Sequence, residues 1–153
     1  MPGRIAPLAL LAALTAVLAG CDSTPPPPPP VPSAPSPSDV CRTLTDSLTA
    51  AVPPGESQAE LQARGIRVRT PLVFPPGTLP RPTTPSGAAV RLQIAPDGTV
   101  VPGSPKTVKT VGDAQVANAV EAAALAMNFD IDAATKPTAP VPFTTVYAAC
   151  LRP

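Results

Sequence analysis

The chain has 153 residues, of which 26 are proline, three are cysteine and none is histidine. Eleven Lys/Arg residues oppose ten Asp/Glu residues, so the formal net charge is only +1. Without histidine the chain lacks the commonest general base and metal ligand. Without a clustered basic excess it lacks the electrostatic footprint of a nucleic-acid-binding protein. Composition therefore favours a binding or structural protein over an enzyme, and no nucleic acid is an expected partner.

A short apolar segment precedes the first cysteine. Arg4 is followed by IAPLALLAALTAVLAG, the layout of a secretory signal peptide. As a helix, residues 5–18 would span about 21 Å, less than the roughly 30 Å hydrocarbon core, so a transmembrane anchor is disfavoured. The residues LAGC at 18–21 resemble the lipobox of bacterial lipoproteins. That resemblance implies that residues 1–20 are removed as a lipoprotein signal peptide and that Cys21 is acylated, for example with palmitate.

Acylation of Cys21 would make the lipid membrane a partner and place the protein in the cell envelope. The lipid would anchor the chain to the inner or the outer membrane, with the following domain in the periplasm. An odd number of cysteines in an exported chain requires a use for the unpaired one. If Cys21 carries lipid, Cys41 and Cys150 remain, and we predict that they form a disulfide. The alternative, an ordinary signal peptide followed by a disulfide to Cys21, leaves one thiol over.

Residues 21–38 form the predicted linker. The stretch DSTPPPPPPVPSAPSPS contains nine prolines in 17 residues. Such a run excludes helix and central strand and favours a polyproline II rod of about 50 Å. A spacer between the membrane and a domain is the favoured interpretation, and a ligand for an SH3-like domain is the alternative.

Residues 39–153 are enough for one domain with a hydrophobic core. Its first predicted element is a helix that begins at Ser38 or Asp39 as N-cap and stops before the PPG at 53–55. Apolar residues recur at helical spacing from Val40 to Val52. The stretch 56–65, closed by Gly65, predicts a short second helix, and the proline-rich stretch 70–85 predicts a surface coil.

The remainder of the domain predicts a strand–strand–helix–strand unit. Residues 90–94 alternate between apolar and polar, the PDG at 96–98 signals a turn, and residues 99–101 would return as the second strand, with 105–111 as a possible extension. Asp113 would cap a helix that runs to Phe129. Residues 141–150 are β-branched and aromatic and predict the last strand. The expected fold class is α+β: a small antiparallel sheet with helices, preceded by an N-terminal helix.

Residues 74–150 resemble the C-terminal domain of the TonB family. Phe74-Pro75 stands where that family has Tyr-Pro, Gly87 precedes the hairpin AAVRLQIAPDGTVV, and Phe129 follows the alanine-rich helix. Met127 stands where tryptophan is usual, and Ile131 where proline is usual. The resemblance implies that an extended segment of a partner, such as an outer-membrane receptor, adds as a strand to the sheet edge. The family's motor-coupled transport needs a membrane helix carrying a histidine, which this chain lacks.

Strand addition would use the last strand, because it is terminal in sequence and need pair on one side only. We expect the edge residues Thr144, Thr145, Val146 and Tyr147 to supply the contacts, with Tyr147 as the main side chain. We expect no cofactor, no metal site and no catalytic residues: Asp130 and Asp132 are too few oxygen ligands for calcium, and no glycine-rich loop precedes a helix. The alternative function is a structural envelope lipoprotein, a spacer with a cap domain and no peptide ligand.

Overall fold

The computed structural model describes residues 34–150. The predicted signal peptide, the predicted acylation site Cys21 and most of the predicted linker lie outside the described residues. The described part is α+β, as expected, with two antiparallel sheets. Its elements are α1 (Pro37–Thr49), α2 (Gln58–Ala63), β1 (Ile66–Thr70), β2 (Ser86–Ile94), β3 (Lys106–Val111), α3 (Ala114–Ala124), β4 (Asn128–Ile131), the 3-10 turn η1 (Ala133–Thr135) and β5 (Val141–Ala149).

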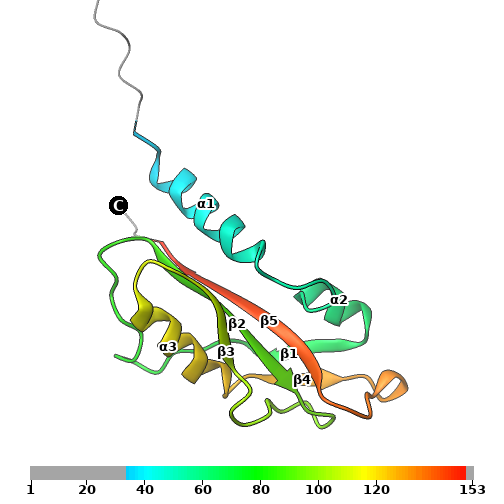
Figure 1. Cartoon of the computed structure of the whole chain (residues 1–153). Helices are drawn as coiled ribbons and strands as arrows, with labels where there is room; N and C mark the ends of the chain where they lie inside the picture. Colours follow the sequence, from blue (N-terminus) through cyan, green and yellow to red (C-terminus); the bar gives the residue numbers. More distant parts are fainter. Residues whose placement is uncertain (1–33, 151–153) are drawn as a thin grey trace, which may run out of the picture. The chain divides into compact units, whose positions relative to one another are not determined.

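A three-stranded sheet in the order β3-β2-β5 forms the centre of the domain. β2 and β5 pair without interruption over nine residues, from Ser86 opposite Ala149 to Ile94 opposite Val141. β2 is buried along most of its length because it has a strand on each side and a helix on each face (Figure 1). β5 and β3 are therefore the two edges of this sheet.

α1 covers one face of the sheet, which explains its apolar stripe. Leu44 and Leu48 are buried against Ala89 of β2, and Val146 of β5 packs on the same cluster. The helix comes close because the strand residues beneath it are small. A Cβ added to Gly87 would lie 2.7 Å from Leu48 Cδ1 and 2.4 Å from the Tyr147 carbonyl oxygen, so only glycine fits there.

α3 covers the opposite face (Figure 1). The larger core lies beneath it. The apolar residues of β2 that point away from α1 pack on the apolar stripe of α3. The members of this core from the two elements are Ala88, Val90, Leu92, Ile94, Val116, Ala117, Val120 and Ala124. Asp113 caps α3 as predicted, accepting a hydrogen bond from the Gln115 N–H at 2.8 Å.

A second, two-stranded sheet closes the core from the side. β1 pairs antiparallel with β4, with Ile66 opposite Ile131, and buries Phe129 against Phe143 of β5, their ring centroids 5.5 Å apart. Residues 71–85 form the predicted coil between β1 and β2, and its Leu72 and Phe74 pack on the core. Among residues 34–150, none of the helices combines the length and the hydropathy that crossing a bilayer requires.

Four details differ from the sequence expectations. The N-cap of α1 is Ser36, whose hydroxyl accepts from the Asp39 N–H at 3.2 Å, so the helix starts two residues early with Pro37 in its first turn. Residues 99 and 100 form only isolated bridges, and the partner of β2 is the segment taken as an extension, Lys106–Val111. α3 ends at Ala124 rather than at Phe129, which lies in β4. The strands β1 and β4, which pair with each other, have no counterpart in the sequence expectations.

Candidate functional site: the outer edge of β5

Backbone groups in β5 alternate between facing β2 and facing outward, because successive residues of a strand point to opposite sides. The Thr144 N–H donates to the Glu56 carbonyl at 3.0 Å, so Thr144 faces away from β2. The unbroken register then turns the main chains of Val146 and Ala148 outward as well. On β2, Gln93, opposite Pro142, likewise faces away from β5: it accepts from the Val101 N–H at 2.9 Å.

These outward groups make up the outer edge of β5. Within residues 34–150, no backbone or side-chain hydrogen bond outside the strands reaches the N–H or C=O of Val146 or Ala148. Pro142, the outward residue at the start of the strand, has no N–H to offer. The amides open to an added strand are therefore those of Val146 and Ala148.

Glu56 occupies the first half of the same edge. Its side chain is buried, with 4 % of the residue exposed, although it lies in the loop between α1 and α2. Its carboxylate accepts from Arg91 of β2 through Nε at 2.9 Å and Nη2 at 2.5 Å, and from Thr144 Oγ1 at 2.9 Å. A buried carboxylate held by a bidentate arginine and a hydroxyl has its charge compensated and its position set. We call Glu56, Arg91 and Thr144 the Glu56 clamp.

Two grooves follow the edge on either side of the strand. The first, of about 240 Å³, lies between the edge and the α1–α2 connection, where Val52 and Gln58 line it together with Thr144 and Val146. The second, of about 430 Å³, lies on the other side and is lined by Val68, Pro71, Leu72, Met127 and Tyr147, among others. The residues that line the two grooves carry no charged side chain. Alternate side chains of an added strand would enter one groove or the other.

Tyr147 stands in the wall of the second groove and is packed from the coil side. The Phe74 ring lies 4.8 Å from the Tyr147 ring, centroid to centroid, at an interplanar angle of 60°. Burial raises the pKa of Tyr147 above its ordinary value, so the phenol stays neutral. The coil thus covers the side chain of Tyr147 on one face, and its backbone makes no hydrogen bond to β5 within the described part of the chain.

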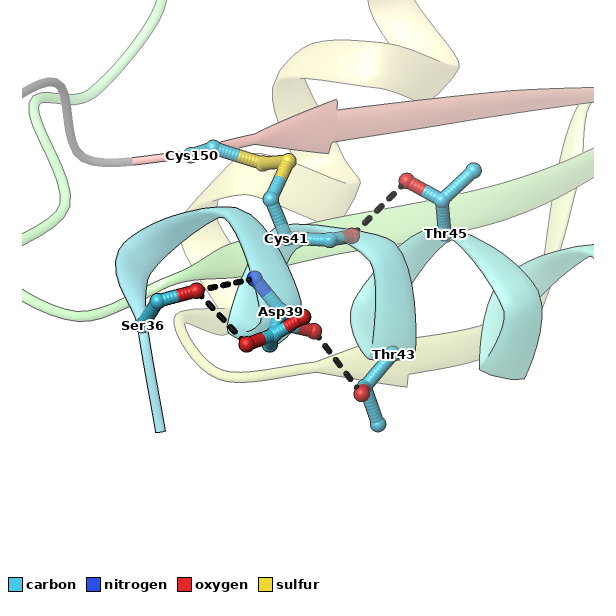
Figure 2. Close-up of a disulfide and its surroundings, with 6 residues drawn as sticks. All are labelled: Ser36, Asp39, Cys41, Thr43, Thr45 and Cys150. Carbon is cyan, nitrogen blue, oxygen red and sulfur yellow. Dashed lines mark hydrogen bonds between the residues drawn. A yellow bond between two sulfur atoms is a disulfide. The ribbon is translucent and has the colours of Figure 1, made fainter. Parts of the chain in front are cut away.

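The far end of β5 is tied to α1. Cys41, in the first half of α1, is joined to Cys150, directly after β5, with their Cα atoms 5.6 Å apart (Figure 2). That separation lies within the usual range for a disulfide. The Ser36 cap and the hydroxyls of Thr43 and Thr45, which donate to the carbonyls of Asp39 and Cys41, hold the helix around the bond (Figure 2). The placement agrees with the predicted pairing.

The four residues predicted for the edge divide into two pairs. Thr144 and Val146 turn their main chains outward, whereas Thr145 and Tyr147 turn theirs toward Val90 and Ala88 of β2. Thr144 is moreover engaged by Glu56. Tyr147 contributes a side chain, as expected, and Ala148 is an outward residue that the sequence reasoning missed.

Glu56 and Leu72 are the other residues that sequence reasoning missed. Arg91 and Thr144 lie 35 and 88 positions from Glu56 in the chain, so no local pattern connects them. Asp130 belongs to β4 and lies 3.5 Å from Arg69 in an exposed ion pair, and Asp132 caps η1. Within residues 34–150, no three carboxylate or cysteine side chains gather as metal ligands would.

Comparison of the chain with protein-family models, with curated proteins and with solved structures found no match. The resemblance to the TonB C-terminal domain therefore stays a prediction that rests on the residues between Phe74 and Cys150.

Proposed function

We propose that this protein is a membrane-anchored envelope lipoprotein whose domain binds an extended segment of a protein partner by adding it as a strand to the outer edge of β5. The observation that carries the proposal is the pair of outward amides at Val146 and Ala148, with two uncharged grooves that both reach Val146. Main-chain hydrogen bonds would give affinity, and the grooves would select alternate side chains. No chemical step is part of the proposal.

The envelope location rests on the sequence before the domain. The lipobox-like LAGC supports acylation of Cys21, and two or more acyl chains would hold the protein on a membrane where one chain would not. The proline-rich linker would let the domain reach a partner at some distance from the membrane. A partner on an outer-membrane receptor, and a part in transport, follow from the family resemblance alone. Intact-mass measurement of membrane-extracted protein tests the anchor: a mature chain starting anywhere but Cys21 would contradict it.

Tyr147 gives a direct assay for strand addition, because the chain has one tyrosine and no tryptophan. A panel of synthetic peptides with alternating threonine and leucine, phenylalanine or valine serves as the probe. We expect at least one of them to change the tyrosine fluorescence in a saturable way. Val146→Pro removes an outward N–H and should abolish the change, since proline at an outward edge position leaves the pairing with β2 intact.

The matched control is Thr110→Pro, because Thr110 is the corresponding outward position on β3. That variant should bind the probe as the native chain does. Equal loss of binding in both variants would mean that the proline acts on folding rather than on the edge. A panel without any saturable response would contradict the proposal.

A cap domain without a peptide ligand is the second candidate function. The Glu56 clamp and the contact between Phe74 and Tyr147 favour it, since both cover part of β5. In that case the Val146 and Ala148 amides would be shielded by α1 and the coil, and the probe panel would leave Tyr147 unchanged.

A further inference from the structure

In the first half of the β5 edge, neither outward amide position can donate a hydrogen bond to an added strand. Pro142 has no N–H, and the Thr144 N–H is taken by the Glu56 carbonyl at 3.0 Å. The Glu56 carbonyl therefore lies where the backbone of an added strand would have to lie. A partner that pairs with Val146 and Ala148 cannot continue along the edge past Thr144 without displacing Glu56.

The clamp is built to resist such displacement. The Glu56 carboxylate takes three hydrogen bonds, two from Arg91 and one from Thr144, and both of its oxygens are used. The exposed fraction of Glu56 is 4 %. Separating its carboxylate from Arg91 or Thr144 would therefore leave a buried charge uncompensated. The neighbouring Ser57–Glu60 capping box fixes the chain directly after Glu56.

The other end of the edge is where β5 ends, at Ala149, directly before Cys150. Its bond to Cys41 places α1 beside the end of β5. Between Thr144 and Cys150 lies a stretch of five residues, Thr145–Ala149, about 17 Å long at strand spacing. The grooves beside it carry no charged side chain, and burying an unpaired charge there would be costly.

We infer that the Glu56 clamp sets the register and length of the strand-addition site, so that the partner segment is a short, uncharged extended peptide of about five residues that pairs with Val146 and Ala148. The identity of the ligand in this inference rests on the proposed function. The clamp itself rests only on the contacts of Glu56 with Arg91 and Thr144. One side chain of the segment, apolar, enters the groove of Leu72, Met127 and Tyr147. Glu56 acts as a positioning residue, because it limits the site without being part of the open edge.

The clamp is tested first without a ligand, by amide exchange on the whole ¹⁵N-labelled chain in detergent. In the native chain the Thr144 amide should be protected and the Val146 amide should exchange fast. Glu56→Ala keeps the carbonyl that accepts from the Thr144 N–H but removes the carboxylate bonds that hold this carbonyl in place. Exchange at position 144 should therefore speed up by about ten- to a hundredfold, the effect of losing hydrogen bonds to a charged group. The amides at 145 and 147, which face β2, should keep their native rates in that variant. A Thr144 amide that exchanges as fast as that of Val146 in the native chain would overturn the inference.

Thr144→Val is the second variant, in case loss of the carboxylate impairs folding. It removes one donor to the Glu56 carboxylate at nearly constant volume and should speed exchange at 144 by a smaller factor. Thr145→Val is its matched control, since that hydroxyl makes no hydrogen bond in the described part of the chain and, as the neighbour of Thr144 in the strand, points to the opposite face. The same rate at 144 in both valine variants and the native chain would also overturn the clamp.

Two probes of alternating threonine and leucine, five and nine residues long, then test the register. In the native chain the affinities of the nine-residue and five-residue probes should agree within about twofold. In Glu56→Ala the nine-residue probe should bind about tenfold more tightly than the five-residue probe, the effect of roughly one additional hydrogen bond. A native chain that prefers the nine-residue probe tenfold would overturn the inference. If neither probe binds while the exchange results hold, the proposed function fails and the clamp stands.

Discussion

The two edges of the central sheet are protected in opposite ways. β3 is short, carries Lys106 and Lys109, and is interrupted by a bulge at Val108, which the register with β2 skips. Its outward Thr107 N–H is taken by the Glu121 carboxylate of α3 at 2.5 Å. β5 is nine residues long, has no charged residue and pairs with β2 without a bulge.

Charges, bulges and short length are the usual means of preventing edge-to-edge association, and β3 uses all three. β5 uses none of these three. Its edge is protected by Pro142, by the Glu56 clamp at Thr144 and by partial cover from the coil. A long uncharged edge is an aggregation hazard unless something occupies it. This difference between the strands is the reason we propose Val146 and Ala148 as the place where a partner adds.

The disulfide between Cys41 and Cys150 joins the end of β5 to α1, and no such bond holds β3. Its loss should have the largest effect on stability. We expect the double variant C41S/C150S to lose about 2–5 kcal/mol of unfolding free energy, because the bond closes a long loop. Exchange should rise in α1 and at residues 146–149 but not in β3. Urea unfolding of the variant should match that of the native chain under reducing conditions. A native chain whose stability does not respond to reductant would contradict this.

Two proline substitutions distinguish the residues of β5 that face β2 from those that face outward. Thr145→Pro removes an N–H that faces β2 and leaves a buried carbonyl unpaired, so we expect a loss of roughly 2–4 kcal/mol. Val146→Pro removes an outward N–H and alters a side chain that packs beside Leu44 and Leu48, so it should cost about 1 kcal/mol. Thermal unfolding followed by circular dichroism measures both. A reversed order would show that the outward and inward assignments in β5 are interchanged.

The protection of β3 can be removed at Glu121. Glu121→Ala deletes the acceptor of the Thr107 N–H and should lower the unfolding free energy by about 1–2 kcal/mol while speeding exchange at Thr107. Gln115→Ala, on the exposed side of the same helix, is the control and should change neither quantity. If Thr107 stays protected without Glu121, the contrast between the edges has another cause.

The smallest effect concerns the ionisation of Tyr147. Burial raises the pKa of its phenol above the ordinary value of 10.0, so this contribution to stability is complete below that pH and is lost as the pH rises through the folded pKa. Phe74→Ala removes the ring that packs on Tyr147 and should lower the pKa toward 10. Ultraviolet absorbance titration reads this single tyrosine directly. An unchanged titration curve would mean that the coil does not cover β5.

Local patterns predicted much of the fold. The alternation in residues 90–94, the PDG turn and the cap at Asp113 placed β2 and α3 correctly in outline. The sequence IRVRT of β1 alternates as clearly, so period-two reasoning could have found that strand. The end of α3 was missed because Met127 continues the apolar spacing of Val120 and Ala124, although the helix has ended by then. Phe129 lies off that stripe and is buried from β4 instead.

The candidate site could be predicted only in part. The terminal strand and its missing charges are visible in the sequence, but which of its residues face outward depends on the Thr144 N–H, which is fixed by a residue 88 positions away. Burial of Glu56 likewise depends on Arg91 and Thr144 together. Contacts of this kind arise from the tertiary fold, and a local residue pattern carries no trace of them.

The central claim is that β5 offers an open edge while β3 does not. A map of backbone amide shifts tests it most directly, measured on the ¹⁵N-labelled chain as a five-residue threonine–leucine probe is added. The account predicts shifts at Val146, Ala148 and their neighbours, and none along Lys106–Val111. Shifts along β3, or a β5 edge that stays silent and exchanges slowly over its whole length, would contradict it.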